Sequence, residues 1–290
     1  MNLRALARWA EGLPPGARCL SLILPLLLTW AFVTGRQGTE LFNRAHTAMN
    51  WQTIEARKGH LEQYSLSKQQ FSNLHAWVLS LPQSADRRAS ISKQLQRAGV
   101  AYEIIDAVDG QDDLPAEEVA FMESRDRLTA FQAGNKYMRA KVGGDLSHAQ
   151  VLQRMLGEHL PIGLVMEDDA KIPPDFLEQL YNAINALPND WDVLHLNGCN
   201  VKASKLAVRK NIHVNHQSSC YLAYAFRRRY ALQVLQMIFK WRLHKDIDDY
   251  MGSLTSSGII QSYITMPFIV DYSGLAANST IEVWRQNPNP

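Results

Sequence analysis

The sequence predicts an α/β domain with a mainly parallel central sheet, preceded by one membrane-spanning helix. From about residue 76, short apolar runs alternate with stretches of helical spacing, which is typical of parallel sheets covered by helices. One of these apolar runs, 164–166, ends in three acids, as expected at the strand ends where open α/β sheets bind ligands. A third observation predicts the membrane helix: residues 19–35 carry no charge.

The N-terminal segments are expected to lie outside the domain. A spanning helix needs about 20 residues, so the 17-residue run 19–35 is at the lower limit. A basic leader, 1–18, before an apolar run also describes a secretory signal peptide, but no small-residue cleavage site follows. We therefore expect an uncleaved single-pass anchor at 19–35, a polar stem at 36–73 and the domain at 74–290.

The composition describes a globular protein with a substantial core. Hydrophobic residues make up 46% of the 290 residues and charged residues 20%. The net charge of +2 gives no indication of nucleic-acid binding. The three cysteines form neither a zinc pattern nor a disulfide framework. Cys199 and Cys220 could pair in an oxidising compartment, which the sequence does not decide.

The first half of the domain reads as strand, helix, strand. Strand signals cover 76–81 and 101–107, and between them 86–98 has helical spacing with Gly99 as a C-terminal cap. The charged stretch 112–138 is expected to be helical.

A capping box, 147–150, then predicts a helix that begins there and ends near Gly157. The strand 162–166 delivers the acids, and Pro173-Pro174 open a further helix. A strand at 191–196 follows. The remaining expected elements are strands near 212–214, 221–225 and 263–270 and a helix at 228–239.

The three acids Glu167, Asp168 and Asp169 repel one another unless a cation offsets the repulsion. In an extended segment Glu167 and Asp169 share a face, and Asp168 lies on the other. Two carboxylates at a strand end suit Mn²⁺ or Mg²⁺, with water and a substrate diphosphate as further ligands. The alternative is that the acids cap the next helix or lie solvated in a turn.

Several motifs in order resemble glycosyltransferase family 25, over roughly residues 76–281. The motifs are Leu79-Ser80-Leu81-Pro82 with Asp86-Arg87-Arg88, Asp106-Ala107-Val108-Asp109-Gly110, Gly143-Gly144-Asp145-Leu146-Ser147-His148, Glu167-Asp168-Asp169-Ala170, Trp191-Asp192-Val193-Leu194 and Asp248-Asp249. The resemblance implies a GT-A-like nucleotide-sugar-binding fold, a UDP-sugar donor that is often UDP-galactose, and inversion at the anomeric carbon.

The resemblance also implies site residues. Glu167 and Asp169 would hold the metal. The donor-binding set would be Leu81, Arg87, Ser147, His148, Asp168 and Asp192. A helix start beside His148 would favour an anion, although Ser147 also reads as a plain cap and Asp192 as a partner of backbone N–H groups. The base that an inverting transfer needs would be Asp248 or Asp249.

Three residues depart from the family pattern. Lys141 and Gly144 stand where the family has a glutamate and a cysteine, and Ser80 stands where it has an asparagine. The sequence therefore predicts a membrane-anchored, metal-dependent hexosyltransferase that acts on a glycan, lipooligosaccharide or glycoprotein acceptor. The first alternative is a degenerate relative that binds glycans or serves as a scaffold. The second is a metal-dependent hydrolase, which would need a further ligand cluster that the scattered histidines do not supply.

The expected location depends on the host, because the domain must meet its donor. In a bacterium the domain would face the cytoplasm from the inner membrane. In a eukaryote it would face the Golgi lumen, and Asn278-Ser279-Thr280 would be a possible glycosylation site.

Overall fold

A computed structural model describes residues 65–72, 74–124, 136–240 and 247–273 of the chain. Within these ranges no helix has the length and apolar character needed to cross a membrane. The expected anchor, 19–35, and the sequon at Asn278 lie outside the described residues.

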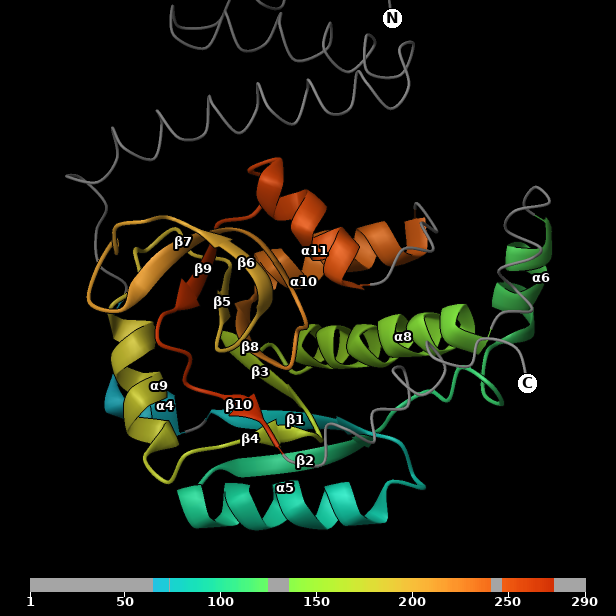
Figure 1. The fold of residues 1–290 in the computed structure, drawn as a ribbon, viewed down its shortest axis with the longest axis horizontal. Helices are drawn as coiled ribbons and strands as arrows, with labels where there is room; N and C mark the ends of the chain where they lie inside the picture. Colours follow the sequence, from blue (N-terminus) through green and yellow to red (C-terminus); the bar gives the residue numbers. More distant parts are fainter. Residues whose placement is uncertain (1–64, 73, 125–135, 241–246, 274–290) are drawn as a thin grey trace, which may run out of the picture. The chain divides into compact units, whose positions relative to one another are not determined.

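The central sheet has eight strands among the described residues, in the order β2-β1-β3-β8-β5-β9-β7-β6 (Figure 1). Their bounds are β1 His75–Ser80, β2 Ala101–Asp106, β3 Ile162–Glu167, β5 Val193–His195, β6 Cys199–Ala203, β7 Ile212–Ser219, β8 Ala223–Arg227 and β9 Ser262–Thr265. A small second sheet pairs β4, Ala170–Lys171, with β10, Asp271–Tyr272.

The sheet is mixed, where the sequence predicted a mainly parallel one. β1 pairs in parallel with β2 and β3, and β5 with β9, whereas β8 runs antiparallel to β3 and β5. β7 is likewise antiparallel to β9 and β6. A parallel crossover takes a dozen or more residues, and the connections between β5 and β8 along the chain are shorter than that. The expected parallel arrangement therefore holds for the β2-β1-β3 part.

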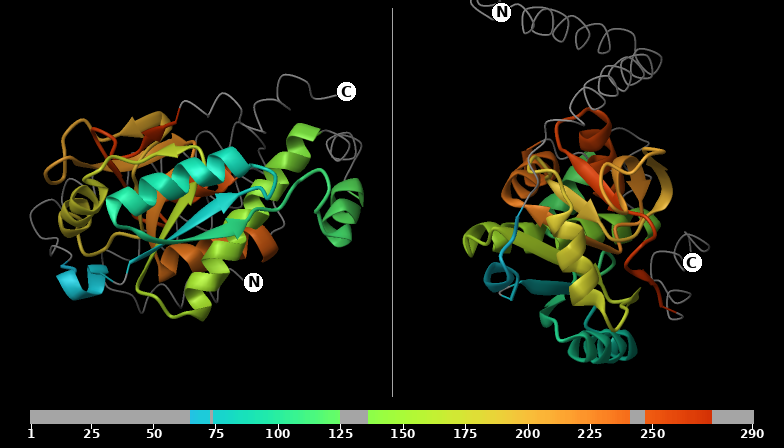
Figure 2. Two further views of the ribbon diagram at one scale, coloured as in Figure 1. Left: turned by 90° about the horizontal axis from the view of Figure 1, so that it is seen from below. Right: turned by 90° about the vertical axis from the view of Figure 1, so that its left-hand side faces the viewer.

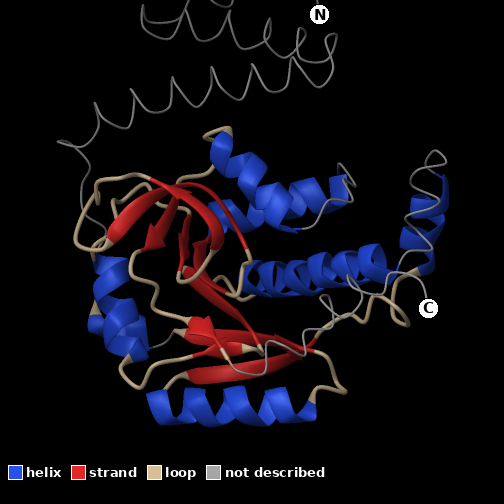
Figure 3. Ribbon diagram, in the orientation of Figure 1, coloured by secondary structure: helices blue, strands red, loops and turns tan. Residues whose placement is uncertain are grey.

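Helices lie on both sides of this part of the sheet (Figures 1 and 3). α5, Ala85–Ala98, contacts β2, and α8, Lys136–Gly157, contacts β1 and β3. The remaining helices are α4 Lys68–Ser72, α6 Ala116–Ser124, α9 Phe176–Asn185, α10 Arg228–Leu235, continued by a π-helical turn Gln236–Lys240, and α11 Ile247–Ser256. α10 and α11 both pack against α8, and aromatic side chains of β8 and α10 fill the core there.

The first strand–helix–strand unit confirms the sequence prediction to within a residue or two at each end. Gly99 has a φ of 70°, and its N–H bonds to the carbonyl oxygens of Leu95 and Gln96, which caps α5 as expected.

The prediction that a helix begins at the capping box 147–150 is wrong, because α8 runs through it from Lys136. The Ser147 hydroxyl instead donates to the Gly143 carbonyl oxygen at 2.6 Å and accepts the Val108 N–H at 2.8 Å. Two adjacent glycines would weaken an isolated helix. Here the loop at Val108 packs on the helix at Gly143, so tertiary contact overrides the local signal.

The folded region extends before residue 74. Leu66 is buried, and its N–H donates to Asn185 Oδ1 at 2.7 Å. The rings of Phe71 and Tyr181 meet edge to face at 5.1 Å. α4 and α9 lie side by side in both views (Figures 1 and 2), so residues from at least 65 belong to the domain.

Candidate functional site

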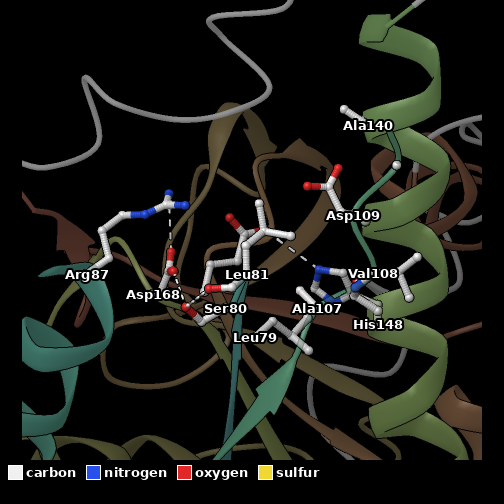
Figure 4. A pocket seen from close by; sticks show the side chains of 14 residues that line it. Leu79, Ser80, Leu81, Arg87, Ala107, Val108, Asp109, Ala140, His148 and Asp168 are labelled. Atoms are coloured by element: carbon white, nitrogen blue, oxygen red, sulfur yellow. Dashed lines mark hydrogen bonds and ion pairs between the residues drawn. The ribbon is translucent and has the colours of Figure 1, made fainter. Parts of the chain in front are cut away.

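A pocket opens where β1 and β3 end. Its walls come from the end of β1, the loop after β2, the middle of α8 and the end of β3 (Figure 4). The lining residues are Leu79, Ser80, Leu81, Arg87, Ala107, Val108, Asp109, Gly110, Ala140, Gly144, Ser147, His148, Glu167 and Asp168. The expected donor residues Leu81, Arg87, Ser147, His148 and Asp168 are thus brought together at the carboxyl edge of the parallel strands.

The three acids form a turn, which we call the acid turn, Glu167–Asp169. Glu167 is the last residue of β3, and the chain turns at Asp168 and Asp169 before β4. The strict alternation expected of an extended segment therefore ends at Glu167. Glu167 and Asp168 line the pocket, whereas Asp169 is buried beside it, and among the residues that the structure describes its Oδ1 atom has no hydrogen-bond partner.

Burial and mutual repulsion make the charged form of these acids costly. Burial raises the pKa of Glu167 to about 7, the Asp168 charge adds to the rise, and Arg87 opposes it. The pKa of Asp169 is also raised to about 7, first by burial and then by the Glu167 and Asp168 charges. Arg87 offsets only part of the repulsion. A further positive charge at this turn would stabilise it.

Arg87 and Ser80 hold Asp168. The Arg87 guanidinium lies 3.3 Å from Asp168 Oδ1 and donates to Ser84 Oγ at 2.7 Å, while Ser80 Oγ donates to Asp168 Oδ2 (Figure 4). Burial raises the pKa of Asp168, and the Ser80 hydrogen bond and Arg87 oppose that rise. Ser80, the residue that replaces the family's asparagine, therefore orients one of the acids.

His148 links the acid turn to β8. Its Nδ1 lies 2.9 Å from the Tyr224 hydroxyl, and its Nε2 lies 3.7 Å from Glu167 Oε1. The expectation that His148 stands at a helix start is wrong, since α8 continues on both sides of it. It reaches the pocket from the middle of that helix. Sequence reasoning missed Tyr224, which lies directly opposite Val165 across the β3–β8 pairing.

Asp192 lies away from this pocket. β5 runs in the same direction as β3, and Phe226 of β8 pairs with Val193 on one side and with Gly163, near the start of β3, on the other. Asp192 therefore lies level with the start of β3, whereas the pocket lies at its end. Asp192 Oδ2 accepts the Gln261 N–H at 2.8 Å and lies 3.6 Å from Arg229 Nη2, in a separate cavity at the opposite edge. The structure therefore does not bring Asp192 to this pocket; it accepts a backbone N–H, as the alternative interpretation of the sequence expected, and it faces an arginine.

The sequence analysis singled out four further residues: the proposed bases Asp248 and Asp249, and Lys141 and Gly144, which depart from the family pattern. Asp248 and Asp249 lie on α11, but their side chains are outside the described residues. Lys141 Nζ lies 4.7 Å from the centre of the Tyr137 ring and does not line the pocket. Gly144 does line the pocket, and among the described residues a side-chain carbon added there would meet no atom within 4 Å.

The local geometry does not contain a complete metal cage. Among the described residues no three His, Cys, Asp or Glu side chains converge as a metal-binding group. Glu167 and Asp169 would supply two carboxylates, so water and a substrate diphosphate would have to complete the coordination of a divalent cation.

Residues 73–251 match the family description "Glycosyltransferase family 25 (LPS biosynthesis protein)". The chain is 28% identical over 138 residues to the "Probable inactive glycosyltransferase 25 family member 3" of Bos taurus, covering 46% of this chain and 23% of the relative. It is also 28% identical over 135 residues to the "Inactive glycosyltransferase 25 family member 3" of Homo sapiens, covering 44% and 22%. The chain thus matches less than a quarter of the length of these relatives.

Proposed function

The chain belongs to glycosyltransferase family 25, and we propose that it transfers a hexose, galactose, from a UDP-sugar to a hydroxyl group of a glycan or glycoconjugate. One observation carries this proposal. The acid turn lies at the carboxyl edge of β3, beside a pocket that also presents Arg87 and His148. A nucleoside diphosphate and a cation together would satisfy both the acids and the arginine.

The acid turn fits a divalent cation, Mn²⁺ or Mg²⁺. The unpartnered, buried Oδ1 of Asp169 and the pocket-facing carboxylate of Glu167 are oxygen ligands of the kind that such ions prefer. When bound, the cation stabilises the charge that develops on the departing diphosphate. Asp168, held by Ser80 and Arg87, would keep the turn in place and offer its carboxylate to a donor hydroxyl.

The proton of the acceptor hydroxyl requires a base, for which we propose Asp248 or Asp249. An inverting displacement needs a base on the acceptor side of the sugar. Both aspartates belong to α11, and α11 packs against α8, the helix that carries His148. This shared packing supports a common site for the acceptor and the donor.

We also propose that residues 19–35 anchor the protein in a membrane with the domain in an oxidising compartment, such as the Golgi lumen of a eukaryote. Cys199 and Cys220 form a disulfide with a Cα–Cα distance of 5.4 Å. Disulfides persist in oxidising compartments and are rare in the cytosol. The alternative is a cytoplasmic domain on a bacterial inner membrane, which suits the LPS biosynthesis of the family description but not a lasting disulfide.

A degenerate, glycan-binding relative is the second candidate, because the similar mammalian proteins are named inactive. Lys141 and Gly144 first suggested this alternative. Lys141 does not line the pocket, and Gly144 leaves it open, so neither residue blocks a donor. Nucleotide binding without turnover would distinguish this candidate from the enzyme.

UDP release tests the proposed function without a choice of acceptor. We expect the full chain to release UDP slowly from UDP-galactose in Mn²⁺, since water can replace the acceptor, and EDTA to abolish the release. A panel of UDP-sugars identifies the hexose. Binding without release, even with glycan acceptors added, would favour the degenerate candidate. Absence of binding to every UDP-sugar would contradict the donor assignment.

Tyr224→Phe is expected to lower UDP release by about three- to tenfold, the loss that one hydrogen bond of ~1 kcal/mol represents. The change removes only the hydroxyl that bonds His148 Nδ1 and leaves the buried ring in place. Tyr230→Phe is the matched control, because the Tyr230 hydroxyl contacts Met251 rather than the pocket. Equal losses in steady-state assays of the two variants would contradict a role for Tyr224 at the site.

A further inference from the structure

The disulfide Cys199–Cys220 lies between two segments that both contact the acid turn. Cys199 is the first residue of β6 and pairs across the sheet with Ser219, the last residue of β7. Cys220, its disulfide partner, is the next residue after Ser219. From Cys220 the chain continues through Leu222 into β8. Cys220 has a φ of 63°, an uncommon conformation for a residue with a side chain.

The first segment, 220–222, holds the front of the acid turn. The Leu222 N–H donates to the Cys220 carbonyl oxygen at 2.9 Å. The Leu222 carbonyl oxygen in turn accepts the Glu167 N–H at 2.8 Å. The backbone of Glu167 is therefore one hydrogen bond away from a segment that the disulfide fixes.

The second segment, 271–273, holds the back of the acid turn. The Tyr272 hydroxyl lies 3.6 Å from Cys199 Sγ, and Tyr272 pairs with Ala170 in the small sheet. The Ser273 N–H donates to the Asp169 carbonyl oxygen at 2.7 Å. The same disulfide thus touches the strand that binds the other end of the turn.

We propose that the Cys199–Cys220 disulfide is a positioning element that holds the acid turn, Glu167–Asp169, in its functional geometry. Three adjacent acids repel one another, so their turn needs restraint from outside its own sequence. The disulfide supplies it through Leu222 on one side and Tyr272 on the other. The catalytic meaning of this restraint rests on the proposed function, whereas the restraint itself does not.

Reduction of the disulfide then becomes a way to loosen the site. Two electrons and two protons from a dithiol such as dithiothreitol convert the disulfide into two thiols, and the dithiol closes into its own disulfide. Both sulfur atoms are then free to separate. We expect the segments 220–222 and 271–273 to move independently after reduction, and the acid turn to lose its fixed spacing.

Amide hydrogen exchange on the full chain tests the restraint directly. Reduction, or the double variant Cys199→Ala/Cys220→Ala, is expected to speed exchange at the Glu167 and Ser273 amides at least tenfold. Exchange at the Gly99 amide, which caps α5 far along the chain, is expected to stay unchanged. In the double variant, dithiothreitol is expected to leave the exchange rates of these amides unchanged. Unchanged exchange at Glu167 and Ser273, or an equal increase at Gly99, would overturn the proposal, as would free thiols in a non-reducing peptide map.

UDP release in Mn²⁺ supplies the second readout. Reduced protein and the double variant are both expected to lose at least tenfold in release, through a higher requirement for Mn²⁺. If the exchange changes but release does not, the disulfide does not position the site and the proposal is wrong. If the oxidised wild type releases no UDP at all, the proposed function fails, and the exchange experiment alone decides the restraint.

Discussion

Replacing Asp169 with asparagine is expected to abolish Mn²⁺-dependent UDP release and, at the same time, to stabilise the metal-free protein. Asparagine has nearly the same shape but removes one of three adjacent charges. The substitution thus removes a carboxylate ligand of the metal and, at the same time, part of the repulsion among the three acids.

The sign of the stability effect follows from the raised pKa of Asp169, about 7, against an ordinary value of 3.8. The folded protein binds this proton more tightly than the unfolded chain does, so the stabilisation from the protonated acid is complete below about pH 4. It is lost as the pH rises through about 7. At pH 7 we expect asparagine to recover on the order of 2 kcal/mol, measured by urea unfolding in EDTA at pH 5 and pH 7.5.

Asp192→Asn is the matched control. Asp192 is also buried, and burial raises its pKa, but its carboxylate accepts the Gln261 N–H and faces Arg229 at the opposite edge of the sheet. We expect this variant to keep Mn²⁺-dependent release and to gain less stability than Asp169→Asn, because the Gln261 N–H and Arg229 already stabilise the Asp192 carboxylate. An Asp169→Asn protein that still releases UDP with Mn²⁺ would contradict the metal-binding role of Asp169. One that is less stable than wild type at pH 7.5 in EDTA would contradict the cost assigned to its buried charge.

Gly143→Ala and Gly144→Ala are expected to differ sharply although the two residues are neighbours on α8. A side chain at Gly143 would come within 2.6 Å of the Val108 carbonyl oxygen and 2.7 Å of the Gly110 nitrogen. Backbone atoms cannot move aside as a flexible side chain can. We expect Gly143→Ala to lower the free energy of unfolding by about 1–3 kcal/mol. We also expect it to displace this wall of the pocket and so to weaken the binding of UDP.

At Gly144 no atom of the described part of the chain lies within 4 Å of an added side-chain carbon, so alanine is expected to stabilise the helix by about 0.5–1 kcal/mol. Thermal unfolding and titration with UDP compare the two variants under the same conditions. Similar losses in both would contradict the packing of the 108–110 loop on α8. Gly144→Cys, which introduces the family's residue, is expected to bind UDP as wild type does to within a few-fold.

Local patterns in the sequence predicted those parts of the fold that depend on neighbouring residues. The α5 helix ends at Gly99 because a glycine there takes the left-handed conformation, and the sequence shows that signal directly. The acid turn was also visible, because it follows an apolar strand. α8 differs from the prediction for the opposite reason. The capping box 147–150 indicates a helix start, and only the packing of the loop at Val108 on Gly143 shows why the helix runs through it.

Residues whose partners lie far along the chain could not be found in this way. Tyr224 meets His148 because β8 inserts antiparallel beside β3, and nothing in either local sequence states that pairing. That position depends on strand order and register, which a single sequence does not record. Asp192 differs, because it stands near the start of a predicted strand, and the sequence already offered the backbone partner that the structure shows.

The most direct test of the metal-assisted donor site is an anomalous difference map from crystals of the oxidised full chain grown with Mn²⁺ and UDP. We predict one manganese peak about 2.0–2.3 Å from the carboxylate oxygens of both Glu167 and Asp169, with the UDP diphosphate completing its shell. UDP bound in the pocket with no manganese at the acid turn, or manganese held elsewhere, would contradict the proposed role of Glu167 and Asp169.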